Sequence, residues 1–341
     1  MEALISSLSR QQSVAIDHAS DVAAARRAGI KLAGVLGFDE TRTGQLAIII
    51  TEAATNIIKH AGHGMLYIGP AQSGAAPGID VVALDSGPGI ADFASSLVDG
   101  VSTAGTAGTG LGALHRLSDE IDVYSQRGKG AAFFMRLWRD TPAPAPRPVV
   151  VGALALPIPG EEECGDGWAF GCHEHGATLL AADGLGHGPE AARAADAAIE
   201  TFGRERGLQP AALMQRVHEA LRITRGAAVA LAYVDCGRDE VRFAGLGNIS
   251  AWVVHDGRRA LVSHNGIVGH NMRKVQEFSA AFPPGALCIM HSDGLQTQWD
   301  LDAYPGLAAR HPSLVAAILM RDFSRRRDDA MVLAVRRRER A

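Results

Sequence analysis

The first part of the chain shows two apolar patterns, one with a helical period and one made of short runs. Residues 21–36 and 43–61 repeat apolar positions every three to four residues, which is typical of amphipathic helices. The short apolar runs predict strands at residues 65–68, 79–84, 121–125 and 131–138. This order of helices and strands predicts an α+β layer with helices packed on one mixed sheet.

Strand-like runs dominate the second part of the chain. Helical patterns interrupt them chiefly at residues 188–205 and 210–223. Many short strands with a few helices predict a β-sandwich flanked by helices. The expected strands are residues 149–156, 168–173, 177–182, 227–235, 240–245, 250–255, 286–291 and 331–336.

Proline stands at every second position from Pro142 to Pro148, between these two patterns. Such prolines remove backbone donors and favour an extended polyproline conformation. A chain of 341 residues also suits about two domains at roughly 150 residues each. We therefore expect an α+β protein with two domains, residues 1–140 and 149–341, joined by a proline-rich linker at 141–148.

Composition narrows the classes of partner and compartment. Lys and Arg number 33 against 37 Asp and Glu, and the net charge of −4 argues against nucleic acid or anionic lipid as a partner. No apolar run approaches the roughly 18 residues that a membrane helix needs. The amino terminus has no export signal, and the four cysteines are scattered as reduced thiols would be. We expect a cytoplasmic protein that binds neither nucleic acid nor membrane.

Glu52 and Asn56 lie four positions apart in the second helical pattern, beside its apolar face. A carboxylate and an amide oxygen at this separation can hold Mg²⁺ and its waters over bound phosphates, because this hard cation takes oxygen ligands. A solvated polar flank is the alternative interpretation. The segment alone leaves both open.

The string Asp85-Ser-Gly-Pro-Gly-Ile90 follows an expected strand. Asp85 is a carboxylate at the strand end, where it can accept a hydrogen bond from a purine amino group. Gly87 and Gly89 permit a tight turn. By itself the string indicates only a turn.

A second glycine-rich loop contains Gly108, Gly110 and Gly112 and runs into a helix. Its bare backbone N–H groups and the helix amino terminus can cradle phosphate. One glycine loop is weak support for a site. The order of all three elements within one domain favours an adenine-nucleotide site.

These three elements resemble the GHKL ATPase family, whose fold is an α/β sandwich. The resemblance implies ATP and Mg²⁺ as cofactors, bound through Asn56, Asp85 and the glycines. For Glu52 it implies a catalytic role, either as general base on an acceptor hydroxyl or in positioning a metal-bound water. Two further strings look most like RsbT-like switch kinases of bacterial stress pathways, with RsbW-like anti-sigma kinases as near neighbours. These strings are Asp99-Gly-Val-Ser-Thr103 and Arg116-Leu-Ser-Asp-Glu-Ile-Asp122.

The second domain places aspartates in turns at strand ends, at Asp166, Asp183, Asp293 and the pair Asp328-Asp329. Carboxylates so placed can converge at one end of a sandwich, and Mg²⁺ or Mn²⁺ takes such oxygen ligands. Two such ions would activate a water for phosphoester hydrolysis. For any single Asp-Gly pair, a β-turn is the alternative.

These strings resemble the SpoIIE-type branch of the metal-dependent serine/threonine phosphatases, most closely its RsbX-like members. The motifs that carry the resemblance are Ala182-Asp-Gly-Leu-Gly-His-Gly188 and His291-Ser-Asp-Gly294. Asp183 and Asp293 are then the expected catalytic core. The terminal Asp-Asp-Ala-Met departs from the family's usual Asp-Asp-Met-Thr, so the choice between Asp328 and Asp329 stays open. The implied metal ligands are Asp166, Asp183, the Gly184 carbonyl, Asp293 and Asp328.

Together the resemblances imply a bifunctional regulator of bacterial stress signalling. Its kinase domain would phosphorylate Ser or Thr on STAS-domain partners, antagonists like RsbS and RsbR, and its phosphatase domain would act on the phosphorylated forms. A sigma factor or a downstream phosphatase is a further candidate partner. The alternatives are an RsbW-like anti-sigma module and an ATP-sensing domain that regulates the phosphatase.

Overall fold

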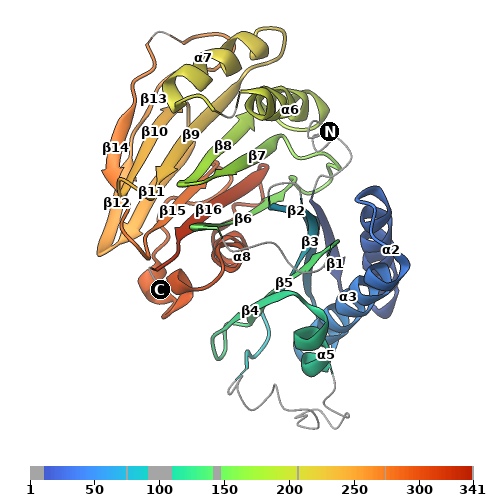
Figure 1. Ribbon diagram of the computed structural model, residues 1–341. Coiled ribbons are helices and arrows are strands. Elements are labelled where there is room, and N and C mark those ends of the chain that lie inside the picture. The colour runs from blue at the N-terminus through green and yellow to red at the C-terminus, as the bar shows by residue number, and fades with distance from the viewer. Residues whose placement is uncertain are drawn as a thin grey trace. The chain divides into compact units, whose positions relative to one another are not determined.

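The computed structural model describes residues 11–73, 76–90, 110–140, 147–205, 207–272 and 274–339 of the chain. Its described residues form two compact units (Figure 1). One contains residues 11–140 with Tyr304–Arg310, and the other contains residues 147–303 and 311–339. Most of the expected proline-rich linker, residues 141–146, lies outside the described residues.

In the first unit, two long helices cover one face of a sheet with strand order β1-β2-β3-β5-β4 (Figure 1). Apolar side chains of both helices and of the sheet form one buried core. The helices are α2 (Ala19–Val35), α3 (Glu40–Ala61) and the shorter α5 (Gly110–Leu117). The strands are β1 (Gln12–Ile16), β2 (Gly64–Ser73), β3 (Ala76–Asp85), β4 (Glu120–Ser125) and β5 (Ala131–Trp138).

Helix α3 forms where the apolar period predicts it, and its two ends are set by specific residues. Asp39 caps its start by accepting a hydrogen bond from the Arg42 N–H at 2.7 Å. Gly62 ends it at φ +80°, a left-handed conformation that glycine adopts without a steric penalty. Between these ends, the apolar stripe that includes Leu46 and Ile50 is fully buried.

The prediction that this sheet has mixed strand pairing is wrong, because all pairings between its described strands are antiparallel. Strand β4 does run in the direction of β3. The hairpin that joins β4 to β5 inserts β5 between them, however, so β3 and β4 form no parallel ladder.

The second unit is a sandwich of two sheets around one apolar core, as the sequence predicts. One sheet has the order β13-β10-β9-β8-β7 with β14 paired to β10, and the other has the order β12-β11-β15-β16-β6. The strands of the first sheet are β7 (Asp166–His173), β8 (Gly176–Gly184), β9 (Ala227–Asp235), β10 (Glu240–Leu246), β13 (Ser263–His264) and β14 (Phe278–Ala281). Those of the second sheet are β6 (Val149–Leu156), β11 (Ser250–His255), β12 (Gly257–Leu261), β15 (Leu287–His291) and β16 (Ala330–Arg337).

Helices flank the sandwich on its outer faces. Helices α6 (Pro189–Arg204) and α7 (Pro210–Leu221) bury an apolar face against the sheet that contains β8 and β9 (Figure 1). A third helix, α8 (Pro312–Phe323), packs against β6 and β16 and was not expected from the sequence. Residues 312–320 of α8 are all buried, so its sequence is apolar all round and lacks the polar stripe that reveals a helix. Among the helices that the structure describes, none has the length and apolar character to cross a bilayer.

Candidate functional site

Glu52 and Asn56 lie one turn apart on α3 and are both half-buried. The Nδ2 atom of Asn56 is buried and has no hydrogen-bond partner among the described residues. A buried amide without a partner costs about 1–3 kcal/mol unless a ligand satisfies it. Asn56 is therefore suited to contact a bound polar group at this face of α3.

The turn after β3 is built around Asp85. Its Oδ1 accepts hydrogen bonds from the N–H groups of Gly87 at 2.8 Å and of Ala131 at 3.3 Å. A Cβ on Gly87 would lie 2.7 Å from the Cβ of Ala61, and Gly89 has a φ of +72°. Gly87 thus lets the turn pack against the end of α3, and Gly89 supplies the positive φ of the turn. The turn brings Asp85 to the helix that carries Asn56.

The second glycine string is described in part. Gly110 begins α5 and Gly112 lies in its first turn, whereas Gly108 lies outside the described residues. Leu114 of α5 is buried in the same core as Ile57 of α3. The start of α5 and the polar flank of α3 are therefore parts of one packed unit. An orphaned amide, a glycine turn and a helix start suit a nucleotide with its phosphates and Mg²⁺.

Asp166 and Asp183 face each other across the antiparallel pair β7 and β8. Burial raises the pKa of Asp166 well above its usual range, and the charge of Asp183 raises it further. Burial, followed by the charges of Asp293 and Asp328, raises the pKa of Asp183 to about 7. The strand pairing therefore concentrates negative charge at this end of the sandwich, an arrangement that a bound cation would relieve.

Asp293 follows β15 and is held by a residue that sequence reasoning did not assign. The Nδ2 of Asn248 donates a hydrogen bond to Oδ2 of Asp293 at 2.7 Å. The Asn248 amide also lowers the pKa of Asp183. Asn248 thus links two of the expected ligands. Its position in the string Gly245-Leu-Gly-Asn-Ile249, directly after a buried strand, is the signal that points to it.

The two residues before Asp293 are buried and also anchor the site. Ser292 donates its hydroxyl hydrogen to Oδ2 of Asp166 at 2.6 Å and accepts the N–H of Met331 at 3.0 Å. His291 accepts a hydrogen bond on Nε2 from the Trp299 indole N–H at 3.1 Å, and burial lowers the pKa of His291 to about 4. The neutral His291 and the Ser292 hydroxyl, which both donates and accepts a hydrogen bond, fix the backbone from which Asp293 projects.

The adjacent Asp328 and Asp329 have different surroundings. Asp329 is 3% exposed, and its two oxygens accept the N–H groups of Ile158 and Gly165, each at 2.7 Å. Asp328 is exposed and lines the same cavity as Asp293. Asp329 therefore fastens two loops together, and Asp328 is the one that faces the site.

Gly184 ends β8, where α6 approaches closely. A Cβ at this position would collide with the carbonyl oxygen of Ala191 in α6. The adjoining loop carries His187, whose Nδ1 lies 3.0 Å from Oε1 of Glu161. Glycine at 184 thus permits the contact between strand and helix, and His187 pairs with Glu161.

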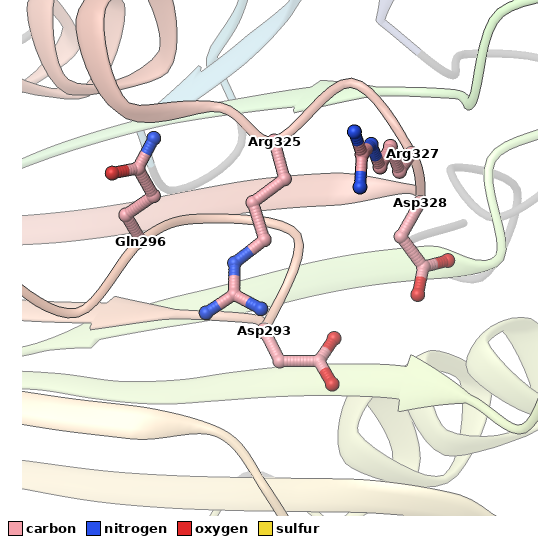
Figure 2. A pocket seen from close by; sticks show the side chains of 5 residues that line it. All are labelled: Asp293, Gln296, Arg325, Arg327 and Asp328. Atoms are coloured by element: carbon pink, nitrogen blue, oxygen red, sulfur yellow. The ribbon is translucent and has the colours of Figure 1, made fainter.

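A cavity of about 400 Å³ opens beside these carboxylates and is lined by Asp293, Gln296, Arg325, Arg327 and Asp328 (Figure 2). Among the described residues, no three His, Cys, Asp or Glu side chains are close enough to hold one metal ion. The carboxylates suit a metal through their chemistry and charge. They offer the oxygen ligands that Mg²⁺ and Mn²⁺ prefer, and a cation would offset the repulsion that raises the pKa of Asp183.

Comparisons with known proteins match both units. Residues 17–137 match the family described as histidine kinase-like ATPase domain, and residues 173–338 match the family described as stage II sporulation protein E (SpoIIE). The serine/threonine-protein kinase RsbT of Bacillus subtilis (strain 168) is 36% identical over 118 residues, which are 35% of this chain and 89% of RsbT. The resemblances drawn from the sequence are therefore confirmed.

Solved structures agree with these matches. A chain from work on the bacterial stressosome, described as a modular system adapted to control secondary messenger signaling, is 30% identical with a TM-score of 0.52. The match covers 55% of this chain and 99% of that one. RsbX in complex with magnesium matches with a TM-score of 0.51 at 18% identity, over 57% of this chain and 97% of RsbX, a likeness that shows the fold alone.

Proposed function

Because the chain belongs to the serine/threonine-protein kinase RsbT family and carries a SpoIIE-type phosphatase domain behind its kinase domain, we propose that it is a bifunctional switch. Its first domain phosphorylates Ser or Thr on STAS-domain partners, and its second domain removes phosphate from the phosphorylated forms. The observation that carries the phosphatase half is the gathering of carboxylates at one end of the sandwich. Asp166 and Asp183 oppose each other across β7 and β8, and burial together with the charges of Asp293 and Asp328 raises the pKa of Asp183 to about 7.

In the second domain, Asp166, Asp183, Asp293, Asp328 and the Gly184 carbonyl would hold two Mg²⁺ or Mn²⁺ ions. Such ions lower the pKa of a bound water and offset the charge on a phosphoryl oxygen. Asn248 orients Asp293, and Ser292 orients Asp166, through the hydrogen bonds described above.

Asp328, not Asp329, is proposed as the terminal ligand. Both oxygens of Asp329 already accept backbone N–H groups, so coordination through Asp329 would leave buried donors without partners. Among the residues that the structure describes, Asp328 has one local hydrogen bond, which its Oδ1 accepts from the N–H of Asp329 at 2.9 Å. Its exposed carboxylate is therefore available to a cation in the cavity.

In the first domain, Asn56 would bind Mg²⁺, and Asp85 would accept a hydrogen bond from the adenine of ATP. The glycines of the two loops would surround the nucleotide: Gly87, Gly89, Gly108, Gly110 and Gly112. The orphaned Nδ2 of Asn56 supports this role, since a bound nucleotide with its hydration shell would supply the missing partner. Glu52, one turn before Asn56 on the same flank, would act on the acceptor hydroxyl as general base or position a water bound to Mg²⁺.

The STAS-domain class of substrate is what the family resemblance of the sequence implies, and the RsbT relative and the stressosome structure support it. The test uses the purified full chain in two separate reactions. With Mg·ATP and an unphosphorylated STAS-domain protein, mass spectrometry should find phosphate on Ser or Thr. With Mn²⁺ and the phosphorylated STAS-domain protein, free phosphate should appear.

Each alternative predicts a different outcome. A chain that retains a sigma factor through purification and transfers no phosphate would support the anti-sigma function. A chain whose phosphate release responds to ATP without any phosphate transfer would support the ATP sensor. Either result would overturn the proposed kinase half.

A further inference from the structure

The cavity beside the carboxylates also holds two arginines that the proposed metal site does not use. Arg325 and Arg327 come from the loop between α8 and β16, and both line the cavity with Asp293 and Asp328 (Figure 2). Neither guanidinium forms an ion pair with a carboxylate of the described residues, whereas nearby Arg321 pairs with Asp322 at 2.7 Å. The site thus presents two unpaired positive charges directly beside its negative ones.

Backbone hydrogen bonds fix this loop against the segment that carries Asp293. The N–H of Arg325 donates to the carbonyl of Gly294 at 2.8 Å, and the N–H of Gln296 donates to the carbonyl of Phe323 at 2.9 Å. An isolated bridge pairs Leu295 with Ser324 between these two bonds. The base of Arg325 is therefore held next to Asp293 by the main chain.

The residue between the two arginines has an unusual backbone. Arg326 has a φ of +52°, in the left-handed region that side chains rarely adopt. It lies outside the set of residues that line the cavity, while its neighbours on both sides belong to that set. Strained backbone of this kind is retained where the surrounding structure fixes it, often at binding sites. Here it accompanies a turn that gives the cavity two arginines from three consecutive positions.

We propose that Arg325 and Arg327 form a phosphate-binding pair that receives the phosphoryl group of a phosphoserine or phosphothreonine protein. The inference rests on the proposed phosphatase function and identifies the residues that recognise its substrate. A guanidinium presents a planar fork of N–H donors that matches two phosphate oxygens, and it stays charged at any working pH. Two such groups balance the two negative charges of a phosphate monoester, while the aspartates bind the metal ions.

The test measures phosphate binding separately from turnover. Inorganic phosphate is titrated into the full chain with Mg²⁺ present and followed by ³¹P NMR, and KM and kcat are measured for a phosphoserine STAS-domain protein with Mn²⁺. The variants are Arg325→Gln, Arg327→Gln, their combination, and Arg327→Lys, which keeps the charge but loses the fork. The matched control is Arg326→Asn, which removes one charge from the same loop and tolerates the left-handed backbone.

Each Gln variant should weaken phosphate binding and raise KM by about 10-fold or more, the effect expected for a lost hydrogen bond to a charged group. Arg327→Lys should fall between Arg327→Gln and the wild type, and Arg326→Asn should stay within about twofold of wild type. Circular dichroism should show all variants folded, since the three arginines are exposed.

The outcomes separate this inference from the proposed function. Wild-type phosphate affinity or KM in the double variant would overturn the arginine pair, as would an equal loss in Arg326→Asn or a wild-type chain that binds no phosphate. Phosphate binding that depends on the arginines, in a chain that hydrolyses no phosphoprotein, would support the pair and contradict the phosphatase function instead.

Discussion

The hydroxyl of Ser292 donates a hydrogen bond to Oδ2 of Asp166 at 2.6 Å, and both residues are buried. This bond joins the end of β15 to the first residue of β7, so it connects the two sheets of the sandwich at the carboxylate site. Because the bond lowers the pKa of Asp166 against the effects of burial and of Asp183, Ser292 favours the ionised form that binds metal.

Ser292→Ala should therefore weaken Mn²⁺ binding. Residues that orient metal ligands typically change metal affinity by about 10- to 100-fold. The variant also leaves the N–H of Met331 without its acceptor and should cost about 1–3 kcal/mol of stability. Calorimetric titration of the full chain with Mn²⁺, together with chemical denaturation, measures both effects. Unchanged metal affinity in the variant would show that the bond between Ser292 and Asp166 has no part in the metal site.

Asp183 predicts how the stability of the metal-free chain varies with pH. Its pKa rises from 3.8 to about 7 on folding, so the folded chain binds more protons than the unfolded chain between these values. The free energy of unfolding should then fall as pH rises from about 4 to 7, by an amount on the order of 4 kcal/mol for this carboxyl. Calorimetric melting at several pH values in a chelator measures the decline.

Two comparisons control that measurement. Asp183→Asn removes the titrating carboxyl and should flatten the decline, which makes the metal-free variant more stable than wild type above pH 7. Saturating Mn²⁺ should also raise wild-type stability most at high pH, because the cation replaces the protons. A metal-free wild type whose stability increases from pH 5 to pH 8 would contradict the electrostatic account of the site.

Asp328 and Asp329 should respond differently to the same substitution. Asp328→Asn should lose Mn²⁺ affinity with little change in stability, since the side chain is exposed. Asp329→Asn keeps one carbonyl acceptor for two backbone donors and should destabilise the second domain by about 1–3 kcal/mol. Denaturation and metal titration of both variants separate the roles, and the reverse pattern would make Asp329 the ligand.

In the first domain, Asn56→Ala should abolish stabilisation by Mg·ATP without destabilising the free chain. The Nδ2 atom that it removes has no partner among the described residues, so no hydrogen bond to it is lost. Glu52→Gln should keep nucleotide binding and lose phosphate transfer to the STAS-domain protein. Melting temperatures with and without Mg·ATP, and a transfer assay, test the two variants. ATP affinity of wild-type strength in Asn56→Ala would remove Asn56 from the nucleotide site.

Local patterns in the sequence predicted much of the fold. The helix at 43–61 and most strands were expected because burial on one face leaves a period in the sequence. Helix α8 was missed because residues 312–320 are all buried and show no polar stripe. The antiparallel pairing of the first sheet was missed because the strand order depends on β5 lying between β3 and β4, which no local pattern encodes.

The expected carboxylates were recognised from Asp-Gly strings at strand ends, but the residues that support them were not. Asn248 lies 45 positions from Asp293, and Ser292 lies 126 positions from Asp166, so only the folded chain reveals these contacts. Asp328 and Asp329 are adjacent residues of the same type, so the sequence alone does not show which one is the metal ligand. They are distinguished by the loops at Ile158 and Gly165, which donate hydrogen bonds to Asp329 alone.

The central claim is that the carboxylates around Asp183 make the second domain a metal-dependent phosphatase. Its most direct test is Mn²⁺-dependent phosphate release from a phosphoserine STAS-domain protein, compared between wild type and Asp183→Asn after both are shown to be folded and to bind Mg·ATP. We predict release by wild type that a chelator abolishes, and a loss of at least about 100-fold in the variant. Equal, chelator-resistant release by the two proteins would contradict the account.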